Sequence, residues 1–211
     1  MTPSTATRRV SDAPTRVLHA LLAICFVGAY LSAESEHWQL VHASFGYTLL
    51  AVLAFRLLYG FWGPRPVRWS SWQSKWRSGW QWLRGLPTLP SLLSMNLRAA
   101  QNFVLLAVSS ALLVLPVPTV LSGHAMYVGS SDGLDDVHEA LASTMLLLVM
   151  AHLSLLLLLS LVRGSNLALP MWSGHVPGPG PDLVTHPRKA LALVLLASTV
   201  GFGIWAARAA L

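Results

Sequence analysis

The sequence has few charged residues and only one cysteine. Of its 211 residues, 10% are Asp, Glu, Lys or Arg, whereas soluble globular domains contain about 25%. This shortage of charge, together with 54% hydrophobic residues, excludes a soluble globular domain and a disordered chain. The single cysteine, Cys25, excludes a disulfide framework and any zinc or iron–sulfur site that needs several thiolates. The composition therefore indicates a membrane protein.

Five apolar stretches are long enough to cross a bilayer, because about 20 residues span the hydrocarbon core as a helix. They lie at residues 17–33, 40–61, 101–121, 138–162 and 190–207. We predict that each is helical, since lipid offers no hydrogen-bond partner to free backbone groups. The first stretch is not a signal peptide, because no small-residue cleavage site flanks it and the second stretch begins at once. The sequence therefore predicts an all-α membrane protein with five spans.

The distribution of Lys and Arg predicts how these spans are oriented. The segments on one side of the membrane hold three, seven and three of the 14 basic residues. The connections on the other side hold acidic residues but no Lys or Arg. By the positive-inside rule, the N-terminus is cytoplasmic and the C-terminus lies outside. The same rule accounts for the net charge of +6, so nucleic acid is not an expected partner.

The connection at 65–82 is rich in tryptophan and in basic residues. Tryptophans recur there at intervals of three and four, so one helical face would carry Trp69, Trp72, Trp76 and Trp80. Such a face with basic neighbours is typical of a helix that lies in the inner headgroup layer. Stacking on single-stranded nucleic acid uses the same residue types, but a segment held between two spans is poorly placed for it. We therefore predict an interfacial amphipathic helix.

Four of the eight histidines fall inside or at the edge of the apolar spans: His19, His42, His138 and His152. A single histidine there is more often a packing residue, but four together need a joint explanation. His138 and His152 are 14 residues apart on one predicted helix, which separates them by about 21 Å along the axis and by only about 40° around it. His42 is level with His138 near the outer face, and His19 is level with His152 nearer the inner face. The histidines therefore sort into two layers, each with one member from each of two helices.

Two imidazoles that face each other across a helical bundle suit bis-histidine binding of haem. Gly46 lies four residues after His42 on the same face and, like Gly28, would leave room for a porphyrin. Arg16 and Arg56 lie near the inner ends of their spans. Two interpretations of these arginines stay open. In one they bind the haem propionates, and in the other they are simple interfacial anchors.

Other interpretations of the histidines have less support in the sequence. Zinc needs three or four ligands that converge on one point, which a separation of about 21 Å along one helix forbids. A proton relay needs buried acids as well as histidines, and the interiors of the spans contain none. A transporter is typically built on a pair of broken helices, which the sequence does not show. A non-haem transport or structural protein is thus the weaker alternative.

Four sequence motifs resemble the bacterial diheme cytochrome b561 family, which includes the cytochrome b subunits of membrane-bound nickel–iron hydrogenases. The motifs are RVLHA at 16–20, HASFGY at 42–47, FRLLYGFWGPRPVRW at 55–69 and VHEALASTMLLLVMAHLSLLLLLSLVRGSNLALPMWSGH at 137–175. The resemblance implies a four-helix bundle, here residues 1–175, that binds two b-type haems. By motif, His42 and His138 are the outer haem ligands, and His19 and His152 are the inner ones. Residues 176–211, a loop and the fifth transmembrane helix, lie beyond the resemblance.

The resemblance also implies a function. Members of the family carry electrons between a redox partner and the quinone pool of the bacterial inner membrane. We therefore expect quinone, membrane lipid and a periplasmic c-type cytochrome, hydrogenase or other dehydrogenase as partners. A self-contained superoxide:quinone oxidoreductase is the alternative enzyme. The outer loops have no Lys or Arg to attract an anion, so the sequence favours an electron-transfer subunit over a stand-alone enzyme.

Overall fold

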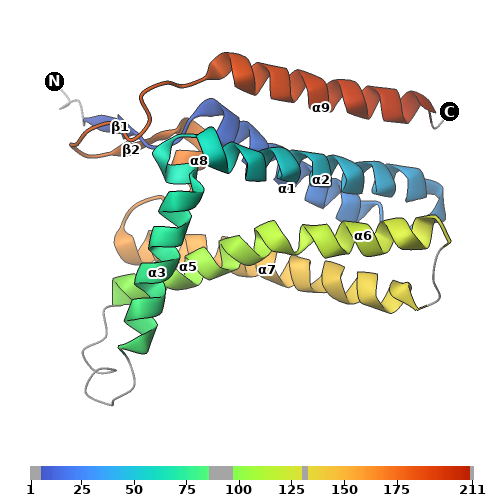
Figure 1. Ribbon diagram of the computed structural model, residues 1–211, viewed down its shortest axis with the longest axis horizontal. Coiled ribbons are helices and arrows are strands. Elements are labelled where there is room, and N and C mark those ends of the chain that lie inside the picture. The colour runs from blue at the N-terminus through green and yellow to red at the C-terminus, as the bar shows by residue number, and fades with distance from the viewer. Residues whose placement is uncertain (1–5, 86–96, 130–132, 210–211) are drawn as a thin grey trace.

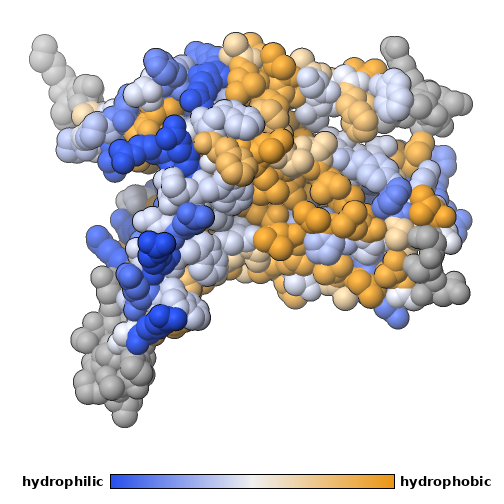
Figure 2. Space-filling view, in the orientation of Figure 1, coloured by the Kyte–Doolittle hydropathy of each residue, from blue (hydrophilic) through white to orange (hydrophobic). Residues whose placement is uncertain are grey.

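The computed structural model describes residues 6–85, 97–129 and 133–209, and it is mostly helical (Figure 1). Four stretches are long and apolar enough to cross a membrane: Ala13–Leu31, Glu36–Trp62, Leu97–Tyr127 and Leu134–Arg163. They overlap the first four predicted spans, so the chain is a multi-pass membrane protein. Apolar side chains cover the middle of the helices, and hydrophilic residues gather at the end that carries the N-terminus (Figure 2).

The long helices form two packed groups that lie side by side (Figure 1). In the first group, α1 (Ala13–Leu31) packs along α2 (Gln39–Trp62), which follows the short 3-10 helix Glu36–Trp38. In the second group, α7 (Leu134–Arg163) packs against α5 (Leu97–Val114) and α6 (Pro116–Tyr127). The contact between α2 and α6 joins the two groups.

The third span is interrupted by two prolines and then continues beyond its predicted end at residue 121. The backbone N–H of Leu115 still donates to the Ala111 carbonyl (2.9 Å), and that of Thr119 to the Leu115 carbonyl (3.2 Å). Pro116 and Pro118 have no N–H to donate, so the backbone hydrogen bonding is interrupted between α5 and α6. Helix α6 begins directly after this interruption. The consequence is that α6 extends to Tyr127 and runs beside the first turns of α7.

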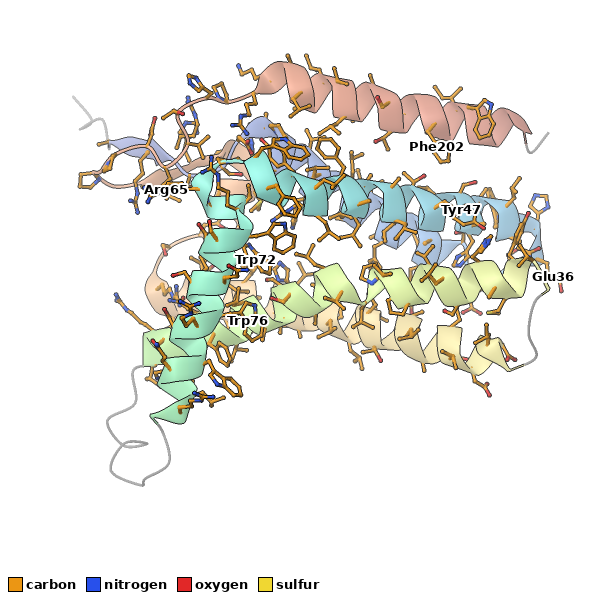
Figure 3. All side chains as sticks on the ribbon, viewed as in Figure 1. Glu36, Tyr47, Arg65, Trp72, Trp76 and Phe202 are labelled. Carbon is orange, nitrogen blue, oxygen red and sulfur yellow. The ribbon has the colours of Figure 1, made fainter. Side chains whose placement is uncertain are left out.

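The segment between α2 and α5 forms a 3-10 turn, Arg65–Val67, followed by helix α3 (Trp69–Arg84), which crosses one end of the bundle (Figure 1). Nε1 of Trp69 donates to the Leu57 carbonyl of α2 (3.0 Å), and Nε1 of Trp76 donates to Ser110 Oγ of α5 (3.1 Å). Trp72 and Trp76 lie on the side of α3 that faces the bundle (Figure 3). The helix lies crosswise, as an interfacial helix does, but much of its tryptophan face packs on protein.

The start of α1 is fixed by a buried polar network at the end that carries α3. Asp12, 1% exposed, accepts hydrogen bonds from the backbone N–H of Thr15 (3.2 Å) and from its hydroxyl (2.5 Å), which is a helix N-cap. The Tyr59 hydroxyl donates to the second carboxylate oxygen of Asp12 and accepts from Nη1 of Arg188 at 2.8 Å. One carboxylate thus ties α1 to α2 and to the segment before α9.

The predicted fifth span forms helix α9 (Lys189–Ala209). Its residues Leu191 and Leu195 pack against a core of Leu18, Leu21 and Tyr59, so α9 lies along α1 and α2. Its apolar part, Lys189–Trp205, is shorter than the four long stretches. That α9 crosses the bilayer therefore stays a prediction.

Two short strands were not predicted from the sequence. Strand β1 (Thr7–Arg9) pairs antiparallel with β2 (His175–Pro177), which follows the short helix α8 (Leu169–Ser173). The backbone N–H groups of Val10 and Ser11 both donate to the Gly174 carbonyl, at 2.9 and 3.1 Å. Gly174 has φ +81°, and a Cβ there would lie 3.0 Å from the Ser11 carbonyl oxygen, so glycine is required at this close approach. The ribbon joins the N-terminal segment to the tail of the second helix group.

Candidate functional site

His42 of α2 and His138 of α7 face each other, with ring centroids 6.0 Å apart and ring planes at 79°. Nδ1 of His42 is 2.8 Å from the Ala29 carbonyl of α1. Nδ1 of His138 is 2.9 Å from the Thr119 carbonyl of α6. A carbonyl only accepts hydrogen bonds, so Nδ1 carries the proton on both rings and Nε2 keeps its lone pair. Both imidazoles are therefore oriented as metal ligands are, with the second ring nitrogen fixed by the protein.

Helix α6 supplies a support for His138 that sequence reasoning missed. Ser122 Oγ lies 3.2 Å from Nδ1 of His138 and donates to the Thr119 carbonyl at 2.9 Å. A Cβ on Gly123 would lie 2.8 Å from Cε1 of His138, so only glycine lets the ring approach α6 this closely. The small residues of the Ser-Gly pair were visible in the sequence, but the span was expected to end before them.

The second pair, His19 of α1 and His152 of α7, lies close enough for the two rings to interact electrostatically. The His152 ring is partly buried, and its Nδ1 has no hydrogen-bond partner among the described residues. A buried nitrogen without a partner is costly, and a ligand bound between the helices would satisfy it. His19 is exposed although it belongs to an apolar helix. The structure thus brings this pair together less tightly than the outer one.

The two glycines that were expected to leave room for a porphyrin differ in their surroundings. A Cβ built on Gly46 meets no atom within 4 Å, and Gly46 is one helical turn from His42 on the same face. Gly28, expected to leave room in the same way, instead accommodates the ring of Phe45, which a Cβ would meet at 2.6 Å. Of these two glycines, Gly46 alone has free space beside its Cα.

The two arginines that were expected to meet haem propionates have protein partners. Nη1 of Arg16 donates to the Trp172 carbonyl of α8 at 2.9 Å, and its buried Nε has no partner in the described parts of the chain. Arg56 is partly buried and interacts electrostatically with Asp12 and Tyr59. These contacts are those of anchoring residues. Contact with a propionate stays a prediction for both side chains.

Across the three described ranges, no group of three or more His, Cys, Asp or Glu side chains is placed to hold a metal ion. The histidines occur in pairs instead. A pair of imidazoles suits a metal whose other ligands come from a macrocycle, as the four pyrrole nitrogens of haem do. The side chains present fit a bis-histidine haem better than a tetrahedral metal centre.

Comparison with known proteins places the chain in a family. A family model described as prokaryotic cytochrome b561 matches residues 10–174, which include all four histidines and the four long apolar stretches. No curated protein and no solved structure matches the chain. The family consists of membrane b-type cytochromes that transfer electrons and bind b-type haem. On this match over most of its length, the chain belongs to the prokaryotic cytochrome b561 family.

Proposed function

We propose that the protein holds two haem b groups, one between His42 and His138 and one between His19 and His152. The observation that carries this proposal is the outer pair, whose rings face each other at 6.0 Å with both Nδ1 atoms bonded to carbonyls. Metal–imidazole bonds are about 2 Å long. Two such bonds and the half-widths of two imidazole rings add up to about the observed separation.

The roles of the surrounding residues follow from these contacts. The Ala29 and Thr119 carbonyls hold the proton of each imidazole on Nδ1, which fixes the ring and leaves Nε2 as the atom that would bind iron. Haem iron, when bound, accepts and releases one electron. A haem held by two imidazoles would have no open coordination position for oxygen chemistry.

The inner pair extends the site through the membrane. His152 lies 14 residues after His138 on α7, so the two layers are about 21 Å apart along the helix axis. This spacing supports electron transfer between the two membrane faces, with quinone as the lipid-soluble carrier. The proposal includes a location in the inner membrane with a cytoplasmic N-terminus and a periplasmic C-terminus, which the positive-inside rule supports.

The acidic side chains at the outer end of the bundle favour a basic periplasmic partner. Glu34, Glu36, Asp135, Asp136 and Glu139 are exposed near this end, and Glu36 lies at the end opposite α3 (Figure 3). Acidic surfaces steer basic partners by complementary charge, as a c-type cytochrome or the electron-transfer subunit of a hydrogenase or other dehydrogenase would require. The same charge repels superoxide, so a superoxide:quinone oxidoreductase has less support.

Selective loss of haem tests the proposal. Purified wild-type protein is expected to contain two haems per chain, with a dithionite-reduced minus oxidised spectrum of low-spin b-type bands. His138→Ala and His19→Ala are each expected to retain one haem, and the two retained haems should differ in midpoint potential. His186→Ala, which changes an exposed histidine before α9, serves as the control with two. Colourless wild-type protein, or the same residual haem in both variants, would overturn the assignment.

A further inference from the structure

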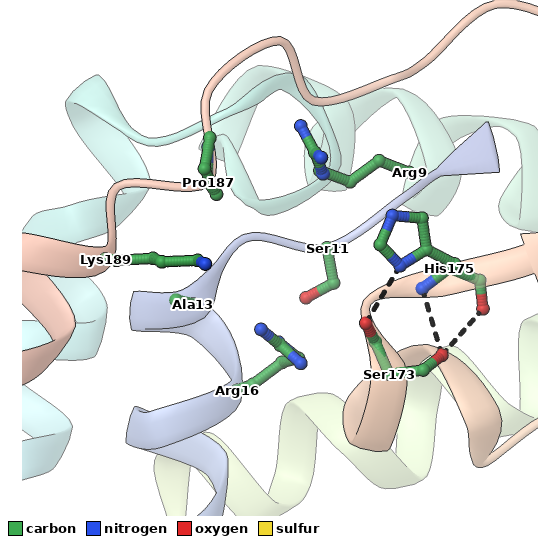
Figure 4. A pocket seen from close by; sticks show the side chains of 8 residues that line it. All are labelled: Arg9, Ser11, Ala13, Arg16, Ser173, His175, Pro187 and Lys189. Carbon is green, nitrogen blue, oxygen red and sulfur yellow. Dashed lines mark hydrogen bonds between the residues drawn. The ribbon is translucent and has the colours of Figure 1, made fainter.

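A basic cavity of about 310 Å³ lies outside the helical bundle, at the end that carries α3. Its polar lining comes from Arg9, Ser11, Arg16, Ser173, His175 and Lys189. Figure 4 shows the side chains of Arg9, Arg16, His175 and Lys189 arranged around one hollow. None of the four paired histidines lines this cavity, so it is a separate site from the proposed haem positions.

The cavity is lined by positively charged side chains, and none of its lining residues is acidic. Asp12, which follows Ser11, is buried and bonded to Thr15 and Tyr59, and Asp182 accepts from the backbone N–H of Arg9 (2.5 Å) outside the lining. In the described ranges, the guanidinium of Arg9 and the ammonium of Lys189 form no hydrogen bond or ion pair. Three cations around one hollow repel each other unless an anion lies between them.

The backbone around the cavity is fixed by three segments that are distant in sequence. The β1–β2 ribbon sets Arg9 opposite His175, and the Gly174 carbonyl accepts from the N–H of Ser11 (3.1 Å). The N–H of Ala13 donates to the Pro187 carbonyl at 3.0 Å, just before Lys189. The basic side chains thus extend from a frame that is already in place, which lowers the entropy lost when a ligand binds.

We propose that this cavity binds a phosphate group. Guanidinium and ammonium groups are the usual protein partners of phosphate oxygens, and hydroxyls such as that of Ser11 add donors. The cavity lies where the apolar helices α1 and α9 begin, since Ala13, Arg16 and Lys189 line it. Lys189 is the first residue of the apolar helix α9, so a headgroup here would leave its acyl chains beside α9. Phosphate in this position has two sources, an anionic phospholipid and the free ion.

Thermal stability of the full-length protein in detergent distinguishes the two sources. Phosphatidylglycerol, phosphatidylcholine and inorganic phosphate are each titrated, and the apparent Kd is read from the shift in melting temperature. Stabilisation by phosphatidylglycerol alone assigns the site to a lipid headgroup. Equal stabilisation by inorganic phosphate assigns it to the free ion. No difference between phosphatidylglycerol and phosphatidylcholine, with no effect of phosphate, would overturn the proposal.

Variants that remove positive charge test whether the phosphate group binds in the cavity. Arg9→Gln with Lys189→Gln leaves Arg16 unchanged, so any contact of Arg16 with a haem propionate is kept. Each cation near a membrane surface contributes about a fivefold gain in affinity for an anion, so the double variant should bind about 25-fold more weakly. Lys75→Gln with Arg77→Gln removes two exposed cations from α3 and is the matched control. Equal weakening in both double variants would show a diffuse surface charge and overturn the proposed site. Haem content, measured alongside, is expected to stay at the wild-type ratio in both.

Discussion

Replacing Gly123 with alanine tests whether α6 holds the His138 ring in place. A Cβ on this residue would lie 2.8 Å from Cε1 of His138 and 3.1 Å from its Nδ1, whereas ordinary contact begins near 3.4 Å. The ring must therefore move by about 0.6 Å in a close-packed interface. A movement of that size along the hydrogen bond would lengthen the 2.9 Å distance from Nδ1 to the Thr119 carbonyl to about 3.5 Å, which no longer orients the ring.

The expected effect is a weaker hold on the outer haem alone. Overpacking of this kind costs about 1–3 kcal/mol, which corresponds to an affinity about 5- to 150-fold lower. We expect Gly123→Ala to transfer one haem per chain to excess apomyoglobin faster than the wild type does. The midpoint potential of that haem should also shift, while the potential of the second haem stays unchanged.

A matched control separates this local effect from the general cost of adding a methyl group. Gly201→Ala places the same methyl on α9, where a Cβ meets no atom within 4 Å. This variant is expected to match the wild type in haem transfer and in both potentials. The reasoning would be refuted if Gly123→Ala also left the transfer rate and both potentials unchanged.

Two further substitutions test the packing at the α3 end of the bundle. Tyr59→Phe removes the hydroxyl that bonds buried Asp12, and a hydrogen bond to a charged group contributes about 2 kcal/mol. The melting temperature of this variant should fall by about 4–8 °C. The control, Tyr30→Phe on a half-exposed ring, should stay within about 1 °C of the wild type. Equal melting temperatures of the two variants would exclude a stabilising role for the network. Trp76→Phe removes the bond to Ser110 and should lower the melting temperature by about 2–4 °C with both haems retained; loss of haem would show that α3 shapes the cofactor site as well.

The first four spans and the spacing of the histidines could be predicted from the sequence because both are local properties. Hydropathy over about 20 residues is set by neighbours along the chain, and the positions of His138 and His152 on one helix follow from its fixed rise and rotation. The cap at Asp12 is a local property as well, because an aspartate followed by a proline in the first turn is typical of a helix start. These features need no knowledge of what packs against each helix.

The supports around the site could not be predicted because they depend on packing between helices. The carbonyls of Ala29 and Thr119 meet the histidines only after α1 and α6 are placed. The same holds for Gly28, whose missing side chain makes room for Phe45 although the sequence suggested room for a cofactor. The hydropathy of α3 likewise does not say whether its tryptophans meet lipid or protein, and the structure places Trp76 against Ser110.

Each histidine of the outer pair lies on a helix that packs against a neighbouring helix. His42 is backed by α1 and His138 by α6, and in both cases the neighbour supplies a backbone carbonyl rather than a mobile side chain. A carbonyl inside a helix has little freedom to reorient, so the imidazole keeps its position when the charge at the site changes. For the haem proposed between these rings, such fixed ligands would favour electron transfer, because preorganised dipoles need no rearrangement at the moment of transfer. The two helix groups therefore act as rigid supports, and the contact between α2 and α6 fixes the separation at which the two rings face each other.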